Sequence, residues 1–272
     1  MSSPPSTPAD THGAEQGANH TADHAADHSA DHSADHRAVE SDGGVDRRRA
    51  AIAGHTGDID TARSLLDHAV PKVRGTALGA LNRLGALTES ELCDALADID
   101  AGVRRRACEE TARWSQPLPP STEPSEHSLS DEPLSEDPLS DDPLPSIALP
   151  GALAEALTDR LLDDDDTVVE IAAWAWGERP PAIERAFELI LTITTDHSDA
   201  LCREAAVAAL GALGDIRALP TILRATTDKA TVRRRAIIAL APFDGPEVDE
   251  ALERARSDRD WQVRQAAEDL SS

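Results

Sequence analysis

One five-residue motif, Val-Arg-Arg-Arg-Ala, occurs twice in this chain, at 103–107 and at 232–236. It belongs to a longer pattern, because a Val or Cys recurs along the chain with an Ala four residues after it at every occurrence. Successive anchors are 30, 65, 34, 30 and 31 residues apart, so the longest step holds a foreign segment. A fixed period of this size is the signature of a repeat architecture. The anchors are Val73, Val103, Val168, Cys202, Val232 and Val263, and their partners are Ala77, Ala107, Ala172, Ala206, Ala236 and Ala267.

The residues around each anchor follow the periodicity of a helix. Mostly apolar residues return four, eight and eleven positions after the anchor, which places them on one face of a helix. A shorter apolar segment precedes each anchor helix, so each unit reads as helix–turn–helix. A single hairpin cannot bury its apolar face alone. The chain is therefore predicted to be all-α, an α-solenoid of about six helical hairpins. Asp caps precede four of the anchor helices, at Asp100, Asp165, Asp199 and Asp260, and Pro71 suits the first turn of another.

The composition agrees with closely packed helices. The chain has no Tyr, two Phe and four Trp, so its core must be filled by Ala, Leu, Val and Ile. Neither a secretory signal nor an apolar stretch of about 20 residues is present in the sequence. The three Cys (Cys93, Cys108 and Cys202) form no Cys-x-x-Cys motif and indicate small buried residues of a reducing compartment. We expect a cytoplasmic monomer with no cofactor and no metal centre.

Charge divides the chain into four segments. Of the net charge of −25, residues 1–45 carry −7 and residues 116–150 carry −8, which leaves −10 for the remainder. Acidic, Pro-rich or low-complexity sequence cannot bury enough apolar surface to fold. We predict a disordered His/Asp-rich tail over 1–45, repeats over 46–114, a disordered acidic Pro/Ser-rich insertion over 115–146, and repeats over 147–272.

The tail has a period of its own. His recurs every four residues from His20 to His36, in register with Asp. On a helix these His would share a face and suit Zn²⁺ or Ni²⁺. The shortage of large apolar side chains favours low-complexity disorder instead. Metal binding by the tail remains the alternative.

The repeat units resemble HEAT repeats, in particular the short bacterial kind named after phycobilisome (PBS) lyases. The resemblance is carried by "DIDAGVRRRACEE", "DALCREAAVAALGALGD", "DKATVRRRAIIALAPF" and "DRDWQVRQAAEDL", and it covers roughly 46–114 and 147–270. The third unit departs from it, because Val169 stands where the others have Arg. The resemblance implies that the recurring Arg bonds an acidic residue at the inter-helix turn and links neighbouring repeats. The ladder residues it implies are Arg74, Arg104, Arg203, Arg233 and Arg264, with Asp98 and Asp258, six residues before Arg104 and Arg264, as acidic partners.

The resemblance also implies that the second helices line the concave side of the solenoid. Residues two and six positions after the anchors then lie off the apolar stripe and face outward. Trp174 and Ile238 stand among charged residues there, which suits protein recognition because aromatic residues and Arg are frequent interface anchors. Alternatively, Trp174 and Trp176 both pack between repeats; Trp261 is expected to cover the C-terminal end of the stack. The predicted protein-binding residues are Trp174, Glu170, Glu204, Arg234, Ile238 and Arg105.

No group of residues argues for catalysis. The sequence has no Gly-rich phosphate loop and no recognisable Ser/His/Asp or Cys/His arrangement. It also lacks the His-Glu dipeptides that bind iron in the HEAT-like deoxyhypusine hydroxylases. The charge of the repeats, which contain only Lys72 and Lys229 as lysines, argues against nucleic acid. We predict a non-catalytic scaffold or adaptor that binds another protein through its concave face. The first alternative is an enzyme or accessory factor of the PBS-lyase-like class, and the second is a nucleic-acid binder.

Overall fold

The computed structural model describes residues 43–116 and 148–270, so nearly all of the predicted tail and of the predicted insertion lies outside the described residues. Residues 43–45, which we placed in the tail, begin the first described helix. Within those two ranges every regular element is a helix, which confirms the expected all-α fold. The helices belong to one packing unit that begins at Gly43. None of the helices in these ranges is long and apolar enough to cross a lipid bilayer. The elements are a helix over 43–56, α2 (Ile59–Ser64), α3 (Pro71–Arg83), α4 (Glu89–Leu96), α5 (Ala101–Arg113), α6 (Gly151–Asp159), η1 (Arg160–Leu162), α7 (Asp166–Gly177), α8 (Glu184–Asp196), α9 (Ala200–Leu213), η2 (Ile216–Ala218), α10 (Leu219–Ala225), α11 (Ala230–Ala239), α12 (Pro246–Ala255) and α13 (Trp261–Leu270).

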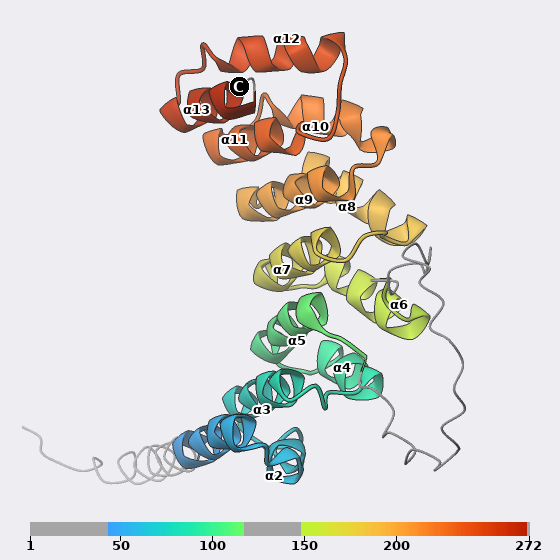
Figure 1. The fold of residues 1–272 in the computed structure, drawn as a ribbon, viewed down its shortest axis with the longest axis vertical. Coiled ribbons are helices and arrows are strands. Elements are labelled where there is room, and N and C mark those ends of the chain that lie inside the picture. The colour runs from blue at the N-terminus through green and yellow to red at the C-terminus, as the bar shows by residue number, and fades with distance from the viewer. Residues whose placement is uncertain (1–42, 117–147, 271–272) are drawn as a thin grey trace, which may run out of the picture. The chain divides into compact units, whose positions relative to one another are not determined.

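The helices stack in two layers (Figure 1). The second helices of the hairpins pack on one another in the order α3, α5, α7, α9, α11 and α13. The first helices form the other layer, where α4 packs on α6, α8 on α10 and α10 on α12. The contacts of α4 with α6 and of α5 with α7 join the two sides of the insertion. The described helices therefore form the predicted α-solenoid, and the insertion interrupts the sequence without interrupting the packing.

Small side chains set the spacing of the second helices. The Ala four residues after each anchor is fully buried, with 0% exposure in all six repeats. A second set of close contacts lies further along these helices. A Cβ added at Gly177 would lie 3.1 Å from Cα of Ala209, and one added at Gly211 would lie 2.6 Å from Cα of Ala239. Each Gly is nine residues after its anchor and each Ala is seven residues after the next anchor, so the contact repeats with the unit.

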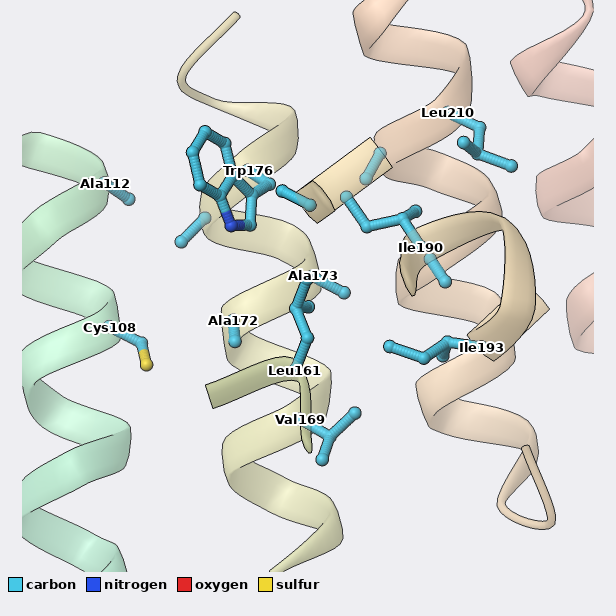
Figure 2. Close-up of a cluster of buried hydrophobic side chains, with 14 of the residues drawn as sticks. Cys108, Ala112, Leu161, Val169, Ala172, Ala173, Trp176, Ile190, Ile193 and Leu210 are labelled. Carbon is cyan, nitrogen blue, oxygen red and sulfur yellow. The ribbon is translucent and has the colours of Figure 1, made fainter. Parts of the chain in front are cut away.

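Figure 2 shows the apolar cluster around α7, which joins side chains of α5, η1, α8 and α9. Trp176 lies in this cluster and is 1% exposed. Val169 is buried in the same cluster, at the position that holds the ladder Arg in the other repeats. The junction of the third and fourth repeats is therefore held by apolar packing.

Four Arg of the second helices make the same forked contact with the following repeat. Nε and Nη2 of each donate to the two oxygens of one Asp carboxylate, at 2.6–2.9 Å. Nη1 of each donates to carbonyl oxygens of the turn before its own helix, at 2.7–3.3 Å. Such paired bonds combine charge with fixed geometry. We call these pairs the rungs; they are Arg74–Asp98, Arg104–Asp163, Arg203–Asp228 and Arg233–Asp258.

The carboxylate of each rung belongs to the next repeat. We had expected Asp98 and Asp258 to pair with the Arg six residues further on, within one unit, but their carboxylates pair with Arg74 and Arg233 of the preceding repeats. The carboxylate of Asp98 accepts from Arg74, whereas Arg104 bonds the carbonyl oxygen of Asp98 at 3.0 Å. A turn Asp therefore serves two repeats, one through its carboxylate and one through its backbone. Asp258 has the same double role, between Arg233 and Arg264.

The series of rungs has one gap, between the third and fourth repeats. Val169 replaces the Arg there, and His197 occupies the turn position that Asp98 holds in its own repeat. Nδ1 of His197 accepts the backbone N–H of Asp199 at 3.1 Å, as the carboxylate of Asp98 accepts that of Asp100 at 2.8 Å. The two replacements go together: because His197 offers no carboxylate, an Arg at position 169 would have no acidic partner in the next repeat.

The small-residue contact predicts that replacing two different glycines by alanine changes the stability differently. Gly211→Ala should lower the free energy of unfolding by about 1–3 kcal/mol, because the added methyl overlaps Ala239. Gly151→Ala is the matched control: a Cβ there meets nothing within 4 Å, so helix propensity should leave stability unchanged or raised. Urea unfolding of both variants measures this difference. Equal stability of the two would mean that Gly211 is not in close packing.

The rungs predict a pH dependence. The hydrogen bonds from Arg203 hold the pKa of Asp228 below its ordinary value. A carboxyl with a lowered folded-state pKa stabilises the fold fully above its unfolded pKa of about 3.9, and this is lost as pH falls through the folded pKa. Asp228→Asn should cost about 1–3 kcal/mol at neutral pH. Its deficit relative to the parent should shrink below about pH 4.

Chemical denaturation across pH 3–7 tests this, with the exposed Asp244→Asn as the control. The side chain of Asp244 makes no hydrogen bond or ion pair with the described residues, so its replacement should change little at any pH. A deficit of Asp228→Asn that stayed constant into acid would contradict the ionic role of the rung.

Candidate protein-binding face

Three grooves lie along the exposed side of the second helices, which we call the second-helix face. The largest is formed by the helix over 43–56, α3 and α5. The next is formed by α5, α7, α9 and α11, and the third by α11 and α13. They correspond to the side on which the sequence places the candidate binding residues.

The middle groove, which we call the Trp groove, has a volume of about 540 Å³ and is lined by Trp174. The indole of Trp174 is half-buried against the core and also lines the groove. The guanidinium carbon of Arg113 lies 5.5 Å from the indole centroid, within the range of a cation–π contact. Trp174 and Trp176 therefore differ: Trp176 is a core residue, and Trp174 keeps an accessible side.

Carboxylates outnumber guanidinium groups around the Trp groove. Glu109 is paired with Arg106 at 2.9 Å, and Glu204 lies 3.6 Å from Arg235. Two further lining residues, Glu170 and Glu178, form no ion pair with any described residue. The groove thus combines apolar surface with two carboxylates that have no cationic partner among the described residues.

Leu201 adds an apolar contact that the sequence analysis did not single out. It lines the Trp groove, is 56% exposed, and directly precedes the anchor Cys202. Its position one residue before the anchor holds Thr in both neighbouring units and Lys, Gly or Gln in the others, so the repeat pattern held no signal for an apolar residue there.

The other predicted binding residues lie outside the Trp groove. Arg234 and Ile238 line the third groove, of about 470 Å³, together with Trp261. Trp261 is 64% exposed at the start of α13, so it lines this groove where we expected it to cover the end of the stack. Arg105 lines none of these three grooves and lies 3.3 Å from Glu109. The six predicted residues are therefore divided between two grooves and one surface ion pair.

The groove at the N-terminal end, which we call the basic groove, has a volume of about 930 Å³. Its lining contains six basic side chains and no acidic one. The sequence did not reveal this groove, because the net negative charge of the repeats as a whole conceals a local excess of basic side chains. The basic residues are Arg47, Arg48, His55, Lys72, Arg83 and Arg106.

One further cluster has the composition of a metal site. Ligand atoms of Asp166, His197 and Cys202 lie within 4.8 Å of one another at the gap between the rungs. Nδ1 of His197 already accepts a backbone N–H, so a neutral ring carries its proton on Nε2, which faces Asp166 at 3.8 Å. Burial, helped by neighbouring acids, raises the pKa of Cys202 to about 12, and its thiol donates to the carbonyl oxygen of Asp166 at 3.2 Å. The thiol of Cys202 holds its proton firmly and donates it to a backbone carbonyl, whereas a metal ligand must be a thiolate, so we assign the cluster to packing.

Comparison with known proteins agrees with this architecture. Residues 187–271, which hold α8 to α13, match the family of HEAT repeats. No curated protein sequence matches the chain significantly.

Several solved structures align with most of this chain. A designed armadillo repeat protein in complex with the peptide (KR)4 aligns with a TM-score of 0.50 at 15% identity, over 78% of this chain and 97% of that one. An engineered protein aligns with a TM-score of 0.49 at 18% identity, over 78% and 96%. Human deoxyhypusine hydroxylase in complex with glycerol aligns with a TM-score of 0.37 at 19% identity, over 84% and 78%. At 15% identity the likeness to the armadillo repeat protein concerns the fold alone: the described helices form an α-solenoid, and residues 187–271 of this chain match HEAT repeats.

Proposed function

We propose that this chain is a non-catalytic interaction module that binds a segment of another protein on its second-helix face, with Trp174 as the central anchor. The observation that carries the proposal is the half-buried indole of Trp174 in a groove with unpaired carboxylates. A partly buried aromatic residue loses little side-chain entropy on binding and offers a large apolar contact.

The charges of the Trp groove indicate the kind of segment. Glu170 and Glu178 form no ion pair with the described residues, so a Lys or Arg of the partner gains a carboxylate without breaking an existing pair. We infer that the partner presents an apolar side chain next to a basic one. The designed armadillo repeat protein, which shares the fold, was solved with a peptide of alternating Lys and Arg. That complex supports the idea that such helical stacks receive basic peptides.

We also propose that the repeats are of the short PBS-lyase-like kind, because their unit is about 30 residues long. No described residue favours the lyase-like enzyme over the interaction module. The linings of the Trp groove and of the third groove contain no Ser, Thr, Cys, Lys or His. In the basic groove, no hydrogen bond joins the side chains of His55, Lys72 and Thr76 to one another, so no nucleophile is paired with a general base.

Peptide selection on the full chain tests the proposed function. Peptides are selected from a random display library against the parent and counter-selected against Trp174→Ala. The enriched peptides should pair an apolar residue with Lys or Arg. In titrations with such a peptide, Trp174→Ala should weaken binding by about 2 kcal/mol, roughly 30-fold, while the melting midpoint changes little.

Charge reversal and a core variant serve as controls. Glu170→Lys should weaken the same peptide, and Glu188→Lys, an exposed position of α8 in the other layer, should not. Trp176→Ala, a change in the core, should unfold the chain or lower its stability by about 3–5 kcal/mol. Equal affinity of the parent, Trp174→Ala and Glu170→Lys for the selected peptides would refute the proposal.

A further inference from the structure

The basic groove differs from the rest of the second-helix face in its charge pairing. The side chains of Arg47, Arg48, Lys72 and Arg83 form no ion pair with any described residue. Most other Arg side chains of the described chain lie within 4.0 Å of an Asp or Glu, as in the four rungs. Several unpaired cations within one concave lining repel each other, and an anion placed among them lowers that repulsion.

The groove exists because α3 has glycines at the two outward positions of its repeat. Gly75 and Gly79 stand two and six residues after the anchor Val73. In the next repeat the same positions hold Arg105 and Glu109, and in the third they hold Glu170 and Trp174. The removal of these side chains opens the space between the helix over 43–56 and α5.

The glycines are not all required by packing. A Cβ at Gly79 would collide with the guanidinium of Arg106, which crosses α3 there and pairs with Glu110 at 2.6 Å. A Cβ at Gly75 would make only an ordinary contact, 3.7 Å from Cγ of Arg106. Glycine inside a helix costs about 1 kcal/mol relative to alanine. No tight contact at Gly75 requires a glycine there to offset this cost. The structural effect of Gly75 is to leave the groove open.

We propose that the basic groove binds a short acidic segment of a protein, through carboxylates that meet the unpaired guanidinium and ammonium groups. Two observations favour a protein segment over nucleic acid. The lining contains no Phe, Tyr or Trp on which a base could stack. The net charge of −25 also repels a long polyanion, whereas a short segment meets only the local field of the groove.

The proposal is independent of the Trp groove, because the two grooves share no lining residue. They are separated on α5, where Arg106 lines the basic groove and Glu109 lines the Trp groove. The Arg106–Glu109 ion pair, at 2.9 Å, spans the border. The two grooves therefore select for opposite charge and can be tested separately.

Fluorescence anisotropy with the full chain tests the inference, using a labelled peptide of alternating Glu and Ser as the probe. The peptide should bind at low salt and more weakly as salt rises. The double variant Arg48→Glu/Arg83→Glu should weaken it by about tenfold or more. The matched double variant Arg224→Glu/Arg256→Glu makes the same charge change at two exposed positions of the first-helix layer, one within α10 and one directly after α12, and should bind like the parent.

A second variant separates shape from charge. Gly75→Leu fills the groove and leaves every charge in place, so it should also weaken the peptide while the melting midpoint stays near that of the parent. Three outcomes would overturn the inference: no binding of the acidic peptide by the parent, equal binding by Arg48→Glu/Arg83→Glu, or tighter binding of an oligonucleotide of equal charge. The last would make the groove a nucleic-acid surface. Binding at the Trp groove should persist in Arg48→Glu/Arg83→Glu, so failure of one proposal does not imply failure of the other.

Discussion

The close approach of successive second helices is the constraint on which this structure depends. Every repeat places a fully buried Ala at the same position of its second helix, and Gly177 and Gly211 lie against Ala209 and Ala239. Helices this close leave no volume between them for a large side chain. Large residues must then lie in the layer between first and second helices, as Trp176 does, or on the outside, as Trp174 does. The aromatic residues available for binding are thus a consequence of how the stack is packed.

The rungs add direction to this packing. An Arg of one repeat reaches forward to the Asp of the next, and the same Asp receives the following Arg at its backbone. Among the junctions between the six described repeats, the one between α7 and α9 has no rung, and these two helices make the most extensive contact of any described pair. Buried apolar surface there takes over the role of the ion pair, since Val169 is part of the core. The part of the Trp groove between α7 and α9 lies over this junction, so packing that does not depend on ionisation holds it.

The sequence predicted the solenoid because a solenoid repeats its contacts with the period of its sequence. The anchor, the Ala that follows it and the Asp caps each describe contacts within one unit or between identical positions of neighbours. The rungs were harder: Asp98 is six residues from Arg104 and 24 from Arg74, and a period alone does not say which of the two its carboxylate meets. The gap at Val169 and His197 was visible as two departures, but their relation needed the structure.

The candidate surfaces were predicted in part for a similar reason. Rows of outward positions identify which side chains share a face, and they placed Trp174, Glu170 and Glu204 together correctly in one groove. They do not say where one groove ends, and so Arg234 and Ile238 were grouped with Trp174 although they line a separate one. The basic groove was not predicted, because it is open where Gly75 and Gly79 have no side chains, and we considered only the side chains that are present. Charges in water act over about 8–10 Å, so a groove of this kind keeps its own sign whatever the total charge. If one extended partner occupies both grooves, its acidic part must lie toward the helix over 43–56 and its basic part toward Trp174, and the order of charges along the partner then decides its direction on the stack.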